Sequence, residues 1–239
     1  MKTIGLIGGM SWESSVEYYR IINEEVKNRL GGLHSAKCLL YSVDFAEIER
    51  YQAEGNWYSA GEKLGEAASS LEKAGAEFIV ICTNTMHKVI DYIEAKITIP
   101  VLHIADATAN QIKKQTITTV GLLGTKYTME QNFYKSRIES EGIKVLIPND
   151  YERELINKVI YEELCLGNIK QSSKDCYKEV IQNLVSNGAE GIILGCTEIG
   201  LLVKQEDVEV PLFDTTKIHA IESVNKALEN LVYRQLSKY

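Results

Sequence analysis

The chain repeats itself weakly at an offset of about 113 residues, and this repeat constrains its fold more than any other feature. Gly75-Ala-Glu-Phe-Ile-Val-Ile-Cys-Thr83 aligns with Gly188-Ala-Glu-Gly-Ile-Ile-Leu-Gly-Cys196. Two more blocks match in the same order: Ile4-Gly-Leu-Ile-Gly8 with Val120-Gly-Leu-Leu-Gly124, and Ile99-Pro-Val-Leu-His with Val210-Pro-Leu-Phe-Asp. Because the matching blocks occur in the same order, we predict that the two halves of the chain have the same order of strands and helices.

Within each half, short runs rich in Ile, Val and Leu alternate with amphipathic stretches, which indicates βα units and a mostly parallel sheet. We therefore predict an α/β protein of two pseudosymmetric domains, each a mostly parallel sheet flanked by helices, with the active site in the cleft between them. The first domain comprises residues 1–102 and 214–239, and the second comprises residues 103–213. The expected strands are 3–7, 36–43, 77–82, 99–103, 118–123, 145–148, 191–194 and 210–213.

Apolar residues at spacings of three and four predict the buried faces of the helices. In the first helix this face is Val16, Tyr19, Ile22, Val26 and Leu30, and in a later one it is Trp57, Ala60, Leu64, Ala67, Leu71 and Ala74. Thr128 and Gln131 have the spacing of a capping box, so a helix is expected to start after Tyr127. The last helix, 217–235, is expected to bury Ile218, Ile221, Val224, Leu228 and Leu231.

The amino-acid composition limits the kinds of molecule that the protein is expected to bind. Lys and Arg number 26 against 33 Asp and Glu, for a net charge of −7, and no long basic cluster offers a footprint for nucleic acid or an anionic membrane. No apolar run approaches the roughly 18 residues that span a bilayer, and the N-terminal apolar stretch is too short for a signal peptide, so we expect a cytoplasmic protein. Five widely spaced cysteines without a C-x-x-C pair predict neither a disulfide framework nor a zinc site.

The strongest candidates for functional residues lie at the ends of two predicted strands. The segment Cys82-Thr83-Asn84-Thr85 follows one apolar strand, and Gly195-Cys196-Thr197-Glu198 follows its counterpart in the other half. Hydroxyls, an amide and backbone N–H groups that converge there are typical of an anion site. The alternative is a buried thiol beside a capping hydroxyl. The repeat places Thr83, and not its neighbour Cys82, opposite Cys196.

Other turns offer weaker candidates. The Gly8-Gly9-Met10 turn lacks the G-x-G-x-x-G spacing of a dinucleotide site, so we interpret it as a place where backbone approaches a small carboxylate, or as a plain tight turn. Thr125 is a candidate carboxylate donor or a simple turn residue. Arg50 and Gln52 lie in a polar segment after Asp44, where a loop that closes over the site or a solvated loop is expected.

Five motifs that span the chain together resemble the aspartate/glutamate racemase family. They are Met1-Lys-Thr-Ile-Gly-Leu-Ile-Gly-Gly-Met-Ser-Trp-Glu-Ser, Cys82-Thr-Asn-Thr-Met-His, Gly124-Thr-Lys-Tyr-Thr-Met, Gly195-Cys-Thr-Glu-Ile and Phe213-Asp-Thr-Thr-Lys-Ile-His-Ala. The resemblance implies an amino-acid racemase that uses no cofactor, neither pyridoxal phosphate nor a metal, and that is commonly a homodimer. Met10, Arg50 and Gln52 are the substrate-binding candidates of the first domain, and Arg50 is expected to pair with an acidic substrate side chain.

This chain departs from the family pattern at one position. Typical members carry a cysteine directly before the Asn-Thr pair and another in Gly-Cys-Thr, so that each thiol serves one face of the substrate's Cα. Here Thr83 precedes Asn84, and the cysteine stands one place back at Cys82. The family pattern and the internal repeat therefore both give the pair Thr83 and Cys196.

Racemisation removes the α-proton from one face and returns a proton to the other, so it needs an acid/base group on each side. We expect Cys196 to be the base, its pKa lowered from about 8.5 by the positive end of a following helix. Thr83 is a far weaker acid than a thiol, so the two directions should be unequal. The resemblance implies that the thiol of the second half addresses the L-enantiomer, so L-substrates should lose their α-proton faster than D-substrates. The neutral groups expected around the α-carboxylate are Asn84, Thr85, Thr125 and Thr197.

The substrate range and the class of function have open alternatives. Aspartate and glutamate are favoured, but Leu166 stands where some aspartate-specific relatives carry a lysine, which leaves room for a broader range. The missing first thiol also fits a dicarboxylate isomerase or decarboxylase of the same superfamily, or an amino-acid binding protein that has lost activity. Exchange of the α-proton would distinguish the racemase from both.

Overall fold

The computed structural model describes residues 1–236, with the side chains of residues 230–236 excepted. It divides into two compact units. The first contains Met1–Cys82, Val89–His103 and the chain from His219 onward, and the second contains Thr83–Lys88 and Ile104–Ile218. This division differs from the expected domains chiefly because the short segment Thr83–Lys88 groups with the second unit. The two units are described separately.

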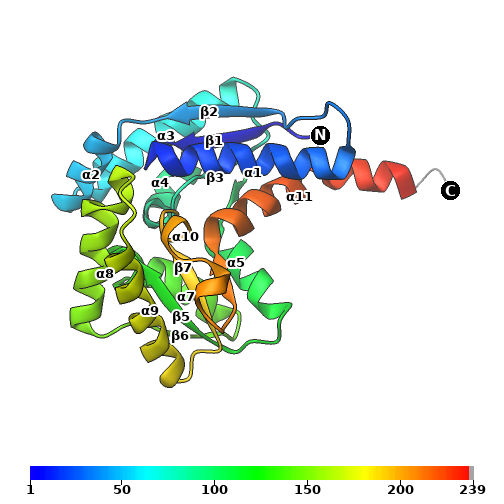
Figure 1. Cartoon of the computed structure of the whole chain (residues 1–239). Helices are drawn as coiled ribbons and strands as arrows, with labels where there is room; N and C mark the ends of the chain where they lie inside the picture. The colour runs from blue at the N-terminus through cyan, green and yellow to red at the C-terminus, as the bar shows by residue number, and fades with distance from the viewer. Residues whose placement is uncertain (237–239) are drawn as a thin grey trace. The chain divides into compact units, whose positions relative to one another are not determined.

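The first unit is built on a parallel sheet whose strand order is β2-β1-β3-β4. Figure 1 labels the first three of these strands. Its strands are β1 (Ile4–Gly8), β2 (Cys38–Ser42), β3 (Phe78–Ile81) and β4 (Val101–Leu102). Its helices are α1 (Trp12–Leu30), α2 (Phe45–Ala53), α3 (Trp57–Lys73), α4 (Ile90–Glu94) and the part of α11 (Thr215–Leu236) that starts at His219. The strand predictions for this half are confirmed to within two residues at every strand end.

The second unit repeats that plan with the order β6-β5-β7-β8. Its strands are β5 (Thr119–Gly124), β6 (Lys144–Leu146), β7 (Gly191–Gly195) and β8 (Leu212–Asp214). Its helices are α5 (Ile104–Lys113), α6 (Lys126–Glu130), α7 (Asn132–Ser140), α8 (Asp150–Glu162), α9 (Gln171–Ser186) and α10 (Ile199–Leu202), and its 3₁₀ helices are η1 (Thr85–Val89), η2 (Leu164–Leu166) and η3 (Gln205–Asp207). The equivalent strand order in both units confirms the repeat.

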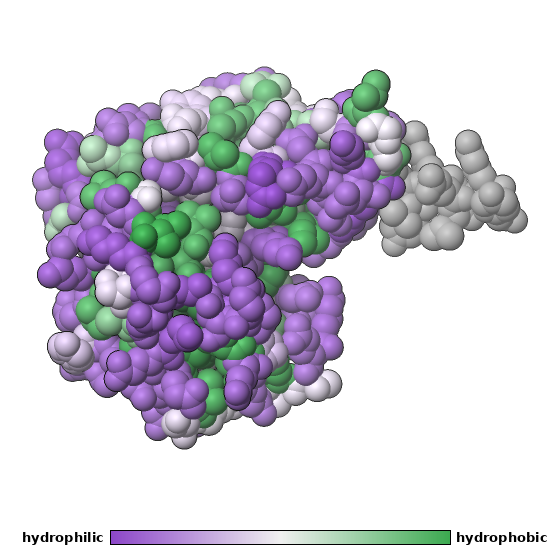
Figure 2. All heavy atoms as spheres, in the orientation of Figure 1, coloured by the Kyte–Doolittle hydropathy of each residue, from purple (hydrophilic) through white to green (hydrophobic). Residues whose placement is uncertain are grey.

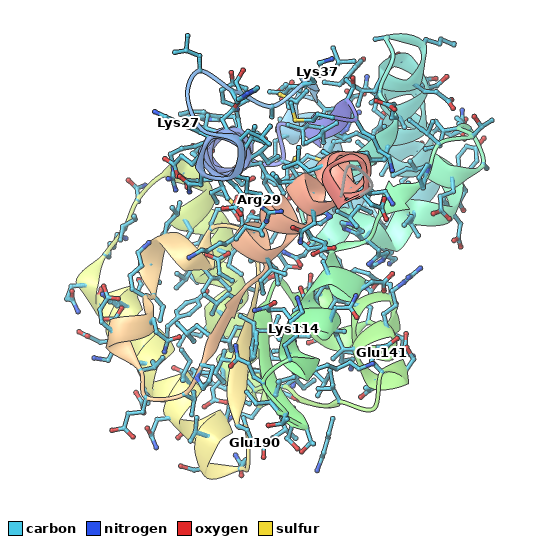
Figure 3. All side chains as sticks on the ribbon, turned by 90° about the vertical axis from the view of Figure 1, so that its right-hand side faces the viewer. Lys27, Arg29, Lys37, Lys114, Glu141 and Glu190 are labelled. Atoms are coloured by element: carbon cyan, nitrogen blue, oxygen red, sulfur yellow. The ribbon has the colours of Figure 1, made fainter. Side chains whose placement is uncertain are left out.

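The Gly-Ala-Glu blocks of the repeat have the same structural role in both units. Glu77 accepts a hydrogen bond from the backbone N–H of Thr3 at 2.7 Å. Its counterpart Glu190, labelled in Figure 3, accepts from the N–H groups of Thr118 and Thr119 at 2.7 and 2.9 Å. Each carboxylate therefore satisfies backbone donors at the start of the neighbouring strand, β1 or β5.

The buried face of α1 differs from the prediction in its first two turns. Val16 and Tyr19 are each 54% exposed, whereas Ser14, Ser15 and Tyr18 are buried. The Ser15 hydroxyl accepts a hydrogen bond from the N–H of Gly9 at 2.8 Å, so the helix buries small polar side chains against the turn that follows β1. Hydropathy alone therefore gave the wrong face here.

Other boundaries also differ from the sequence prediction. The polar segment after Asp44 is the helix α2 and not a loop, because the Asp44 carboxylate caps it by accepting from Ala46 N at 3.1 Å. The strand β6 is shorter than the predicted run and starts one residue earlier. Ile22, Val26, Val224 and Leu228 are buried as predicted, while the predicted burial of Leu231 lies outside the described side chains.

Hydrophilic side chains cover most of the face drawn in Figure 2, and apolar side chains reach that surface in small groups. Among the described residues, no helix is both long and apolar enough to cross a membrane.

The buried His219 of α11 forms hydrogen bonds with two other segments of the first unit. The Nε2 atom of His219 lies 2.8 Å from the carbonyl oxygen of Leu102, and Nδ1 lies 2.8 Å from the Tyr18 hydroxyl. A carbonyl only accepts, so Nε2 carries the proton and Nδ1 of the neutral ring accepts from Tyr18. Burial lowers the pKa of His219 from its ordinary value of 6.5 to about 4.

We expect this histidine to make the protein sensitive to acid. The unfolded chain takes up the proton first, so the stability that His219 contributes is complete above about pH 6.5 and is lost as the pH falls toward 4. Between pH 7 and pH 5 this loss is about 2 kcal/mol. In urea unfolding at these two pH values, His219→Gln should lose about 2 kcal/mol less than wild type, and the exposed control His34→Gln should lose as much as wild type. An equal pH dependence in His219→Gln would contradict the assignment.

Candidate active site

The end of β3 presents Thr83, not Cys82. The Cys82 N–H donates to the carbonyl oxygen of Ile7 at 2.9 Å, which extends the sheet by one residue. Its side chain is fully buried in the apolar core of the first unit, and this burial raises the pKa of the thiol. Thr83 is half-buried. The placement favours the pairing of Thr83 with Cys196 that the repeat predicts.

A buried histidine holds the backbone at Thr83. The Nε2 atom of His87 accepts from the N–H of Ile104 at 3.3 Å, so Nδ1 carries the proton of the neutral ring and donates to the Thr83 carbonyl oxygen at 2.9 Å. His87 thus has a structural contact on each nitrogen. Among the described residues, no group of three or more His, Cys, Asp or Glu side chains could hold a metal ion.

Asn84 is oriented by the first residue of α11. The Thr215 hydroxyl donates its one hydrogen to the carbonyl oxygen of Leu194 at 2.8 Å, so it can only accept from Asn84. The Asn84 Nδ2 therefore faces Thr215, at 3.0 Å, and Oδ1 faces the other way. Oδ1 is buried and has no hydrogen-bond partner within the described part of the chain. Thr215 was not a predicted site residue, although it lies in the motif Phe213-Asp-Thr-Thr-Lys-Ile-His-Ala.

Three threonine hydroxyls form a buried cluster. The Oγ1 atom of Thr85 lies 3.0 Å from that of Thr125 and 3.5 Å from that of Thr128, and the last two lie 3.2 Å apart. The prediction that Thr128 caps a helix is wrong: α6 is capped by Thr125, which accepts from the Thr128 N–H at 3.3 Å. Thr128 lies inside the helix, where its hydroxyl joins the cluster.

Two glycines bring this cluster next to Cys196. Gly124 at the end of β5 is paired with Gly195 at the end of β7. A Cβ on Gly124 would lie 2.8 Å from the carbonyl oxygen of Gly195, so a side chain there would force the two strand ends apart. Because both are glycine, Thr125 and Cys196, which follow them directly, lie at the same edge of the sheet.

Cys196 is bonded to a buried carboxylate. Its Sγ donates to Oε2 of Glu198 at 3.0 Å, and the Thr197 hydroxyl donates to the same oxygen at 2.7 Å. Burial, followed by the charge of Glu198, raises the pKa of Cys196. The predicted lowering is therefore wrong. The helix that was expected to supply positive charge, α10, is a single turn of four residues, and Glu198 stands between it and the thiol.

Three predicted site residues belong to the first unit. Met10 is buried after a turn whose Gly9 N–H is already bonded to Ser15, so that N–H is not open to a carboxylate. The Arg50 side chain is exposed on α2, with its guanidinium 5.2 Å from the Tyr51 ring centroid. Gln52 is buried on the same helix. The second unit contains the other predicted residues, which are Thr83, Asn84, Thr85, Thr125, Cys196 and Thr197.

Sequence reasoning missed Glu198, Thr215 and Thr128 as members of the site. Each lies within a quoted motif, but its contact depends on a partner that the fold supplies. Taken together, the second unit offers a thiol with a buried carboxylate, a cluster of hydroxyl donors, and an amide acceptor without a partner. These are groups that can move a proton and bind a small charged molecule.

Comparisons with known proteins agree on one family. The family model described as Asp/Glu/hydantoin racemase matches residues 7–222. A crystal structure from Yersinia pestis, provisionally described as an Asp/Glu racemase, is 61% identical, with a TM-score of 0.89 and coverage of 95% of this chain and 100% of that one. An aspartate racemase homologue from Pyrococcus horikoshii is 39% identical, with a TM-score of 0.82 and coverage of 95% and 99%. The broad specificity amino-acid racemase RacX of Bacillus subtilis is 26% identical over 233 residues, which are 94% of this chain and 98% of that protein.

Proposed function

The chain belongs to the Asp/Glu/hydantoin racemase family, and from this we propose that it interconverts the L- and D-forms of aspartate and glutamate by proton transfer at Cα, without a cofactor. The observation that supports this most directly is the Cys196 thiol at the end of β7 beside the hydroxyl cluster at the end of β5. The proposal includes a cytoplasmic location and a homodimer.

In the proposed reaction, Cys196 and Thr83 are the two acid/base groups, one for each face of Cα. Cys196 removes the α-proton of the L-enantiomer, and Thr83 delivers a proton to the opposite face. The intermediate is an ene-diolate whose negative charge develops on the α-carboxylate, so donors aimed at that group lower the barrier. Thr85 and Thr125 supply hydroxyl donors from the cluster described above. Thr197 was expected in this set, but it donates its one hydroxyl hydrogen to Glu198 in the structure and so is not a donor to the α-carboxylate.

Asn84 takes a different role from the one expected. One of its two amide N–H groups is bonded to Thr215, and Oδ1, the side-chain atom without a partner, is an acceptor. An acceptor suits the α-ammonium group of an amino acid rather than its carboxylate. We therefore assign the ammonium to Asn84 and the carboxylate to the threonine hydroxyls.

The substrate range depends on the residues that would face the side chain of the amino acid. We propose that Arg50 pairs with the acidic side chain and that Gln52 and Met10 support it from the first unit. Leu166, at the end of η2, is 66% exposed and offers no cation. Among the relatives, RacX is described as having broad specificity, which supports a range beyond a single acidic amino acid.

Proton NMR in D₂O tests the function. Purified protein is incubated without added cofactor with L- and D-aspartate and with L- and D-glutamate, and the α-proton signal is followed. The equilibrium constant of racemisation is unity, so kcat/KM for conversion is equal in the two directions, but α-proton exchange need not be. We expect faster exchange from the L-enantiomers, because the thiol is the stronger acid/base group. Turnover of a dicarboxylate with no exchange from any of the four substrates would instead support the isomerase.

A further inference from the structure

Glu198 holds the proton of the Cys196 thiol in a short hydrogen bond. The distance from Sγ to Oε2 is 3.0 Å, and the carboxylate is only 2% exposed. The Thr197 hydroxyl donates to the same oxygen. Since a carboxylate oxygen has two lone pairs, Oε2 can bond a proton on one while it accepts from Thr197 on the other.

The surroundings of this pair disfavour a second negative charge. The titratable groups that face the pair within the second unit are Cys165 of η2 and Tyr177 of α9, and Glu163, which follows α8, acts on Tyr177. Asp214 of β8 lies on the adjacent strand, against Gly200. All of these are neutral or negative at neutral pH. Loss of the thiol proton to solvent would therefore leave two buried anions side by side, which is costly at low dielectric.

We propose that Glu198 is a positioning residue that accepts the thiol proton of Cys196, so that the thiolate base forms by transfer inside the pair and not by proton loss to solvent. This inference rests on the proposed function, in which Cys196 is the base for L-substrates. The S–H bond breaks, an O–H bond forms on Oε2, and the charge of the pair stays at −1.

The proton balance closes over one turnover. The thiolate takes the α-proton of the L-substrate and becomes a thiol again, while Glu198 stays protonated. Thr83 gives its hydroxyl proton to the opposite face of Cα and is left as an alkoxide. The cycle ends when the proton on Glu198 returns to the Thr83 oxygen through solvent, so no proton is gained or lost overall.

Internal transfer predicts a distinctive pH profile. No proton enters or leaves the pair when the base forms, so α-proton exchange from L-glutamate should change by less than about twofold between pH 6.5 and 8.5. In Glu198→Gln the amide cannot accept the proton, and each thiolate must form by loss to solvent. Its exchange rate should then rise about tenfold per pH unit, or about 100-fold across the same range.

The experiment measures kcat/KM for α-proton exchange from L-glutamate across this range in wild type, Glu198→Gln and a matched control, Glu163→Gln. The control removes a nearby carboxylate that is bonded to Ser173 and not to the thiol, so its profile should stay flat. If kcat/KM of Glu198→Gln does not change with pH, the proposal is overturned. A residue with a structural role alone would lower kcat/KM by the same factor at every pH. A wild-type profile that rises tenfold per unit also overturns it.

A second readout needs no turnover. The rate at which iodoacetamide modifies Cys196, followed by mass spectrometry of its peptide, reports the thiolate directly. It should be flat in wild type and rise about tenfold per pH unit in Glu198→Gln. If no amino acid exchanges its proton, the proposed function fails while this measurement still tests the pair. If Glu198→Gln does not fold, the modification rate of Cys196 in wild type tests the proposal on its own. A rate that rises tenfold per pH unit would overturn the proposal.

Discussion

Replacement of Cys196 by alanine is expected to reduce α-proton exchange from L-aspartate and L-glutamate by about 10²–10⁴-fold, the usual contribution of a positioned acid/base group. The thiol is the group at the end of β7 whose proton can leave and return, and alanine has no such proton. The measurement is the loss of the α-proton NMR signal in D₂O, with each variant at the same concentration as wild type.

The control for this variant is Cys176→Ala. Cys176 is a partly buried cysteine of α9 that has no part in the proposed chemistry, so its replacement should leave exchange unchanged. Thermal unfolding of both variants checks that they are folded, because Cys196 packs in the core of the second unit. Exchange at the wild-type rate in folded Cys196→Ala would remove the thiol from the mechanism.

The sheet arrangement was predictable because the repeat constrains it. Two blocks that end in Gly8 and Gly124 and two that end in Thr83 and Cys196 imply equivalent strand orders, and the structure has them. Local helix details were less predictable. The spacing from Thr128 to Gln131 matched a capping box, yet a hydroxyl three residues earlier took that role. Several hydroxyls compete for each helix start, and only the fold decides among them.

The electrostatics of the site were the least predictable part. A thiol at a strand end before a helix is ordinarily activated by the helix, and this rule predicted a lowered pKa for Cys196. Glu198 was visible two residues later, but its effect depends on the rotation of one side chain toward the sulfur and on the burial of both groups. Residue identity and spacing do not contain that information.

Thr83→Ala should separate exchange from racemisation. Cys196 in this variant can still remove the α-proton of an L-substrate, exchange it for deuterium and return it to the same face. We expect the α-proton NMR signal of L-glutamate to disappear while formation of D-glutamate, measured by chiral chromatography, falls by about 10²-fold or more. Racemisation at the wild-type rate would contradict the role of Thr83.

The neighbouring cysteine provides the matched control. Cys82→Ser places a hydroxyl in the apolar core of the first unit and should lower stability, but racemisation by the folded protein should persist, because the Cys82 side chain is fully buried. Thr83→Cys should act in the opposite direction to Thr83→Ala. A thiol, with a pKa of about 8.5, forms an anion far more readily than a hydroxyl, so α-proton exchange from D-substrates should rise at least about tenfold. If Cys82→Ser abolished racemisation and Thr83→Ala did not, the thiol one residue back would be the second acid/base group, and the alignment of Thr83 with Cys196 in the repeat would have no catalytic meaning.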